Sequence, residues 1–282
     1  MTTDCILTQN FFLKQLKSLS LLQIKIILGR ARLNFSIKQL SFYLQQIYLH
    51  QTQQIHFKLL YKKLNYPYSY ANFMKNIALC SKLMNSVFNT SNKYNNIKKS
   101  TLFNVVDTSL LPNKQSSSIC QKNWDKQQVT SRTIKMSKYS KQKIKIYICG
   151  YKGLFFMNRQ GFIYSASLKN INFADNEVTK NPYMYSISNI LLADRAFNSK
   201  NIRERSKGIF RLISPYRKCE KLQLSLEEKV FYKKRWPIET VFQRIKNPYD
   251  RFKLKLSSKY CENIQRAVFY LAIIKYNLNM MQ

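Results

Sequence analysis

Carboxylates are rare in this sequence, and three of them have settings that suit metal chemistry. The chain has 13 Asp and Glu against 48 Lys and Arg. Asp107 directly follows the apolar run "FNVV" and Asp194 directly follows "ILLA", while Glu239 lies within the basic stretch "YKKRWPIETVFQRIK" at 232–246. Ligands gather at the carboxyl ends of strands in open α/β sheets. If the two strands are neighbours, Asp107 and Asp194 converge, and such a pair favours a cation such as Mg²⁺ between them.

Each of these acids also has a purely structural interpretation. An Asp after a strand often serves as a turn residue or a helix cap. Glu239 is four residues after Arg235, so the two can form an i,i+4 ion pair worth about 0.3–0.5 kcal/mol. The residue types alone leave both interpretations open.

The stretch at 232–246 predicts a helix that carries its polar side chains along the edge of its buried face. Pro237 either kinks this helix or starts a new one, and Glu239 falls in the first turn after it. Ser225 and Glu228 have the spacing of a capping box ahead of it. Trp236 fits a core position better than a stacking position against a DNA base. On one continuous helix, a single face would hold Tyr232, Arg235, Glu239, Phe242 and Lys246.

The rest of the chain predicts a helical region followed by an α/β domain. Residues 1–88 have apolar side chains at three- and four-residue steps, with Asp4 as the only acid. This basic region suits DNA binding, and a helical cap on a neighbouring domain is the alternative. Residues 89–100 are polar and indicate a linker. In 101–282, strands are expected up to Asp107, across 143–168 with the turn "NRQG", before Asp194 and at "GIFRLIS", with a long polar loop after Asp107. Helices complete the α/β domain.

The composition points to a polyanionic partner inside a reducing compartment. The net charge is +35, and 45% of the residues are hydrophobic, enough for a real core. The longest apolar run, Val268–Ile274, is far shorter than a membrane span, and no signal peptide is predicted. Six scattered Cys, with no C-x-x-C pair, suit the cytoplasm. His50 and His56 have no nearby acid or Cys, which argues against a zinc enzyme or a histidine-based hydrolase.

The sequence resembles the DDE transposases of bacterial insertion sequences. Their signature, Tyr-x2-Arg-x3-Glu-x6-Lys, is met by Tyr232, Arg235, Glu239 and Lys246. "VVDTSLLPNK" is similar to the segment around the first Asp, "GYKGLFFMNRQGFIYSASL" to the strand pair that follows, and "LLADRAFNSKNIRE" to the segment around the second Asp. "NYPYSYANFMKNI" is similar to the region ahead of the catalytic domain in insertion-sequence family 982. The likeness spans most of the chain.

This resemblance implies a ribonuclease H-like mixed sheet flanked by helices. It implies that Asp107, Asp194 and Glu239 hold two Mg²⁺, which Mn²⁺ can replace, for cleavage and strand transfer at the ends of an insertion sequence. The implied partners are double-stranded DNA, both element ends and target, and further copies of the chain in at least a dimer, associated with the bacterial nucleoid. The implied DNA-backbone contacts are Tyr232, Arg235 and Lys246. Lys152 and Arg195 lie beside the expected site in the sequence and are two further candidates for phosphate contacts.

The sequence departs from the family pattern at two places. Ala196 stands where a Gly usually follows the second Asp and its basic neighbour, and Leu154 follows Gly153 where a His is usual. These departures keep two alternatives open: a decayed copy that only binds DNA, and a ribonuclease H-like nuclease. Asp175 is interpreted as a loop residue rather than a fourth ligand.

Overall fold

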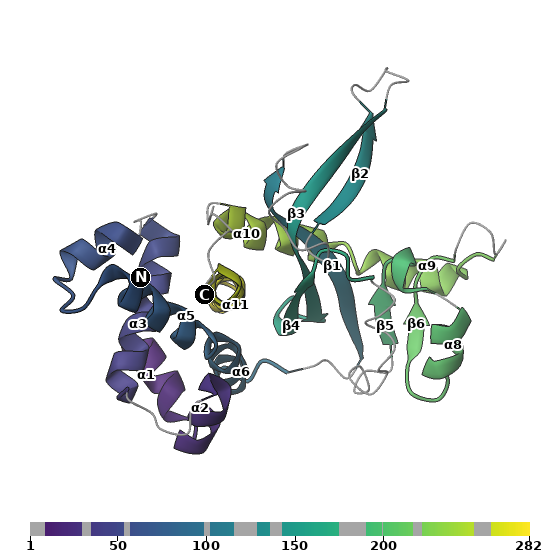
Figure 1. Cartoon of the computed structure of the whole chain (residues 1–282). Coiled ribbons are helices and arrows are strands. Elements are labelled where there is room, and N and C mark those ends of the chain that lie inside the picture. The colour runs from purple at the N-terminus through teal and green to yellow at the C-terminus, as the bar shows by residue number, and fades with distance from the viewer. Residues whose placement is uncertain are drawn as a thin grey trace. The chain divides into compact units, whose positions relative to one another are not determined.

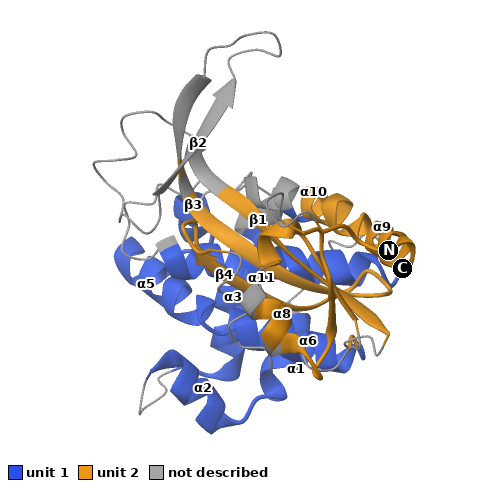
Figure 2. Cartoon of the chain, turned by 90° about the vertical axis from the view of Figure 1, so that its right-hand side faces the viewer, with its two compact units in different colours: residues 1–96, 245–282 blue, residues 97–244 orange. Residues whose placement is uncertain are grey.

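The computed structural model describes residues 9–29, 35–53, 57–98, 102–115, 129–135, 143–174, 190–198, 200–216, 222–250 and 261–282. The chain divides into two compact units, coloured separately in Figure 2: residues 1–96 with 245–282, and residues 97–244. The boundary at 96/97 falls inside the segment interpreted as a linker, although helix α6 continues into that segment as far as Tyr94. The predicted domain limits of 1–88 and 101–282 stay predictions.

The first unit is made of helices, as its three- and four-residue apolar spacing predicted. They are α1 (Gln9–Lys17), α2 (Leu21–Leu28), α3 (Ile37–Gln53), α4 (Phe57–Lys63), α5 (Tyr70–Ser81), α6 (Met84–Tyr94) and α11 (Cys261–Asn279). Helix α11 packs against α3, α5 and α6 and is buried on nearly all sides between Ile264 and Tyr276. The Phe88 and Tyr270 rings stack at 5.5 Å, and Asn277 Nδ2 donates to Asn92 Oδ1 at 3.1 Å. No described helix combines the length and apolarity that crossing a membrane requires.

The second unit is a mixed α/β structure around a six-stranded sheet (Figure 1). Its strands are β1 (Phe103–Gln115), β2 (Val129–Lys135), β3 (Lys143–Asn158), β4 (Ile163–Asn170), β5 (Ile190–Ala193) and β6 (Arg211–Ile213). The order is β2-β3-β1-β5-β6, and β4 pairs with the second half of β3. The pairs made by β3 are antiparallel, whereas β1–β5 and β5–β6 are parallel.

The sheet confirms most of the predicted strands and corrects one loop. The β3–β4 hairpin turns at "NRQG", where Asn158 N donates to Phe162 O at 2.9 Å and Gly161 takes φ 92°. The polar loop expected directly after Asp107 is wrong for 108–115 and for 129–135, which are strands. These polar residues are extended because β3 is long enough to pair with both β1 and β2, which satisfies their backbone groups.

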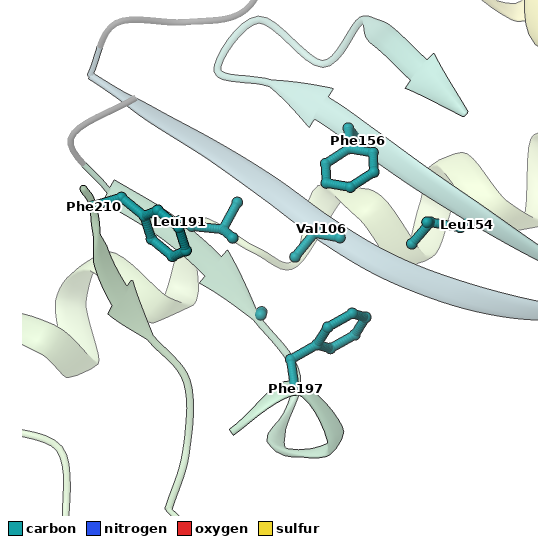
Figure 3. Packing of buried hydrophobic residues seen from close by; sticks show 7 residues of the cluster. Val106, Leu154, Phe156, Leu191, Phe197 and Phe210 are labelled. Carbon is teal, nitrogen blue, oxygen red and sulfur yellow. The ribbon is translucent and has the colours of Figure 1, made fainter. Parts of the chain in front are cut away.

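Alternation along the strands gives the sheet two apolar faces. One face carries a cluster of buried side chains from β1, β3 and β5 together with Phe197 and Phe210 (Figure 3). Val106, Leu154 and Leu191 belong to this cluster. The opposite face includes Val105 and Phe155, and the Phe155 ring lies 5.0 Å from that of Phe242 on α10 (Pro237–Asp250). The sheet is therefore covered by α10 on the face that Asp107 shares.

Candidate active site

Asp107 and Asp194 occupy matching positions on two neighbouring strands. The parallel register of β1 and β5 ends with Val106 opposite Ala193, so Asp107 and Asp194 each come directly after the last paired residue. β1 continues beyond Asp107, where Asp107 pairs in register with Phe155 of β3. β5 instead ends at Ala193. The expectation that the two Asp residues converge at one edge of the parallel pair fits this register.

Asp194 is held in place by local hydrogen bonds. It is the N-cap of a short 3-10 helix, η5 (Arg195–Phe197), and its Oδ1 accepts from Arg195 N at 2.7 Å. Ser214 Oγ donates to the Asp194 carbonyl oxygen at 2.7 Å. The capping role considered for an Asp after a strand is thus present here. The other carboxylate oxygen, Oδ2, makes no hydrogen bond with the described residues, so a cap and a ligand role are compatible.

The helical side of the site comes from two helices and the turn between them. Ser225 and Glu228 form the predicted capping box of α9 (Leu226–Lys233). The helix ends there, and Arg235 N and Trp236 N bond back to Tyr232 O and Lys233 O at 3.0 and 3.2 Å. The helix then restarts at Pro237, whose missing N–H costs nothing at a first helical position. Of the two outcomes predicted for the proline, a new helix is the one observed.

This break places Arg235 in a turn rather than on a helix face. The α10 side chains of Ile238, Val241 and Phe242 are buried. Their burial holds the preceding turn against the face of the sheet that carries Asp107. The single continuous face predicted for Tyr232, Arg235 and Glu239 is wrong, because the chain turns between α9 and α10, yet the three side chains remain close together.

Arg235 connects the candidate acids through its guanidinium group. Its Nη2 donates to Asp107 Oδ2, and its Nη1 lies 3.6 Å from Glu239 Oε1. The Arg235 and Asp107 side chains are only 12% and 9% exposed, whereas Glu239 is 53% exposed. The Arg235 Cζ lies 5.9 Å from the centre of the Tyr232 ring. The i,i+4 ion pair considered from the sequence is present, and a longer-range pair to Asp107 accompanies it.

The electrostatics of the cluster are set by burial and by this cation. Burial raises the pKa of Asp107 to about 6, and this effect outweighs the attraction of Arg235 and the hydrogen bond from Thr108 N at 2.7 Å. The charge of Asp194 adds to the rise, which indicates that the two carboxylates are close. Burial works to lower the pKa of Arg235, but Asp107 and its neighbours outweigh it and raise that pKa. Arg235 is therefore a permanent cation here.

The carboxylates suit a hard cation in kind but are not gathered around one position. Carboxylate oxygens are the ligands that Mg²⁺ prefers, and Asp107 and Asp194 lie on adjacent strands. Within the described ranges, no group of three Asp, Glu, His or Cys side chains is close enough to share an ion. The positive charge that lies between Asp107 and Glu239 is the Arg235 guanidinium. The Arg235 Nε atom is buried and makes no hydrogen bond with the described residues.

The other predicted DNA contacts are placed differently. Lys152 is three residues before Phe155 on β3, so it projects from the face opposite Asp107, and its Nζ donates to Phe173 O at 2.6 Å. The structure does not bring Lys152 to the cluster. Arg195 follows Asp194 directly and is exposed. The side chain of Lys246, although it belongs to α10, lies outside the described residues, as does Asp175.

Trp236 is exposed, in contrast to the core position favoured by its sequence context. Its side chain is 72% exposed in the turn directly after Arg235. The signal for this was Pro237, because a helix restart leaves the residue before it in a turn rather than on a packed face. The Asp107–Arg235 pair could not be anticipated in the same way, since the two residues are 128 positions apart.

One comparison with known proteins identifies a related domain. Residues 113–250 match the family model described as the transposase DDE domain. This match supports a DDE transposase. No curated protein and no solved structure matches the chain. The transposase match includes Asp194 and Glu239 and begins after Asp107, so Asp107 joins the candidate site through its pairing with β5 and Arg235.

Proposed function

We propose that this protein is a transposase that cleaves DNA at the ends of an insertion sequence and joins the resulting 3′-hydroxyl to target DNA. The observation that carries the proposal is that acids from distant parts of the chain act on one guanidinium, two of them by direct contact. Arg235 pairs with Asp107 and Glu239, and the charge of Asp194 acts on Arg235 as well. A transposase DDE domain match over most of the same unit supports this assignment. Similarity to insertion-sequence family 982 and a ribonuclease H-like sheet belong to the proposal.

Asp107, Asp194 and Glu239 are the residues that would hold Mg²⁺, or Mn²⁺ in its place. When bound, a pair of such ions supplies an activated water or 3′-hydroxyl and stabilises the leaving oxygen of the phosphodiester. The chain's own part is to present carboxylate oxygens from two neighbouring strands and to keep water away from the buried Asp107. Asp107 and Asp194 each accept a backbone hydrogen bond, whereas Glu239 is exposed on the first turn of α10.

Arg235 has to exchange partners for the three acids to act together. Its guanidinium neutralises Asp107 in the arrangement described, and a planar guanidinium is also well suited to two oxygens of a phosphate. We therefore assign Arg235 to the DNA backbone in the loaded complex, with Tyr232, Arg195 and Lys246 as its companions. Lys152 is left out because its ammonium bonds to the Phe173 carbonyl on the other face of the sheet. The partner is double-stranded DNA, bound by at least two copies of the chain.

The test is cleavage of a duplex copied from the DNA that flanks this gene, in the presence of Mg²⁺. Asp107→Asn, Asp194→Asn and Glu239→Gln should each abolish strand cleavage while leaving DNA binding within a few-fold of the unmodified chain. Glu227→Gln is the matched control, because Glu227 is an exposed acid of α9 that makes only a 4.0 Å contact with Arg211. A variant of the first three that keeps normal cleavage would remove that residue from the site.

A second function is favoured by the same ion pair. A chain that only binds DNA, such as a decayed copy that occupies the element ends, would keep Arg235 on Asp107 permanently. The cleavage test separates the two functions, since such a chain binds the duplex and leaves it intact with Mg²⁺ or Mn²⁺. A ribonuclease H-like nuclease is separated by strand joining, because a nuclease hydrolyses the strand and forms no joined product.

A further inference from the structure

The contact between Arg235 and Asp107 competes with metal binding at the candidate site. Asp107 Oδ1 accepts from Thr108 N at 2.7 Å, and Asp107 Oδ2 accepts from Arg235 Nη2. Each oxygen of this nearly buried carboxylate is therefore already engaged. A divalent cation on Oδ2 would lie beside the guanidinium, and like charges repel strongly where water is excluded. Asp107 can thus hold Arg235 or a divalent cation, but not both.

The Arg235 guanidinium has a donor that Asp107 leaves unused. Nε and Nη2 lie on one edge of the planar group, and this edge can pair with two oxygens of a carboxylate or a phosphate. Nη2 donates to Asp107, whereas Nε is buried and makes no hydrogen bond with the described residues. A buried donor without an acceptor is costly. Two phosphate oxygens would satisfy both donors, so a phosphate is a better partner for this edge than Asp107 is here.

The charges of the cluster connect the position of Arg235 to metal affinity. Arg235 pairs with Asp107 and lies 3.6 Å from Glu239, and the charge of Asp194 acts on both Arg235 and Asp107. While the guanidinium stays in this position, it offsets one of three negative charges. Once it moves to a phosphate, the carboxylates lose the cation that they share, and their affinity for a hard divalent cation rises.

We propose that Arg235 makes metal binding depend on DNA: its guanidinium keeps Asp107 from a divalent cation in the free protein, and a DNA phosphate releases Asp107 by taking the guanidinium. This coupling rests on the proposed function and adds an order of assembly to it, in which DNA binds before Mg²⁺ or Mn²⁺. Coupling between two ligands is reciprocal, so the metal must strengthen DNA binding by the same factor. The plain alternative is a structural ion pair that never opens.

The first experiment measures Mn²⁺ binding to the full chain without DNA, by electron paramagnetic resonance of the free ion. Arg235→Gln should lower the Mn²⁺ Kd about tenfold or more, because it frees Asp107. Adding Asp107→Asn should abolish this gain. Arg211→Gln is the matched control, since Arg211 is half exposed and pairs with Glu228 at 3.1 Å, and it should leave the Kd within about twofold. A purely structural Arg235 predicts the opposite sign, because its loss would disturb the site and weaken Mn²⁺ binding.

The second experiment uses the unmodified chain, so it decides the matter even if Arg235→Gln does not fold. A labelled duplex of unrelated sequence supplies backbone phosphates without an element end to cut. Its Kd is measured by fluorescence anisotropy at constant ionic strength, with a chelator and then with Mn²⁺. Mn²⁺ should lower the Kd about tenfold for the unmodified chain and for Arg211→Gln, and should give no such gain for Asp107→Asn. General competition of cations for the DNA backbone has the opposite sign.

Failure of the coupling is distinguishable from failure of the proposed function. If the chain cleaves element ends with Mg²⁺ but Mn²⁺ leaves the duplex Kd unchanged, the proposed function stands and the coupling is refuted. The same holds if the folded Arg235→Gln variant binds Mn²⁺ no more tightly than the unmodified chain. If no form of the chain binds Mn²⁺, with or without DNA, and element ends stay intact, both proposals are overturned.

Discussion

Replacing Arg235 with Gln should destabilise the protein, and by an amount that depends on pH. The side chains of Arg235 and Asp107 are 12% and 9% exposed, so the change leaves a buried carboxylate without its cation. Removing one member of a buried ion pair typically costs about 3–5 kcal/mol. Glu239 contributes little to this loss, because its 3.6 Å contact is made by a side chain that is half exposed.

The sign of the pH dependence follows from the pKa of Asp107. Burial raises that pKa to about 6 in the folded protein, from an ordinary value of 3.8. The folded state therefore holds more protons than the unfolded state between these values, and the free energy of unfolding falls as pH rises from about 4 to 6. The shift corresponds to about 3 kcal/mol, present in full below pH 3.8 and lost above pH 6. Without Arg235 the pKa rises further, so the decline should continue above pH 6.

The assay is urea unfolding followed by circular dichroism, in metal-free buffer with a chelator, at pH 5 and pH 8. We expect Arg235→Gln to lose about 3–5 kcal/mol at pH 8 and clearly less at pH 5, where Asp107 is already protonated. Adding Asp107→Asn to Arg235→Gln should recover stability at pH 8, because it removes the uncompensated charge. An equal loss at both pH values, or no recovery in the double variant, would show that Arg235 does not compensate Asp107.

Three further predictions test the elements that position the site. Phe242→Ala should cost about 3–5 kcal/mol in urea unfolding, because Phe242 is 8% exposed and its ring packs on Phe155 at 5.0 Å; a loss below 1 kcal/mol would contradict this packing. Ser225→Ala should cost about 1 kcal/mol by removing the α9 capping box, with Ser225→Asp as the control that restores a cap. Trp236→Ala should leave stability unchanged, since the side chain is 72% exposed, while weakening binding of DNA ends by about 1–3 kcal/mol in a fluorescence anisotropy titration; loss of stability instead would indicate a packing role.

Local sequence signals determined much of the architecture. The four apolar residues before Asp194 became strand β5, the "NRQG" turn joined β3 to β4, and Ser225 with Glu228 capped α9. Each depends on neighbours within a few residues, such as apolar runs, turn residues and capping side chains. Pro237 is also a local signal. It predicted an interruption of the helix but left open whether the helix would kink or a new helix would begin.

Only the tertiary structure decided which side chains meet. The continuation of β1 beyond Asp107 depends on the length of β3, and the position of Lys152 on the opposite face depends on the strand register. The pairing of Asp107 with Arg235 depends on α10 packing through Phe242 onto Phe155. The sequence by itself identified Asp107, Asp194 and Glu239 as candidates and predicted the apolar strands before the first two. That one of them is neutralised by an arginine 128 residues away was decided by the sheet register and helix packing, because these bring distant residues together and no local pattern encodes them.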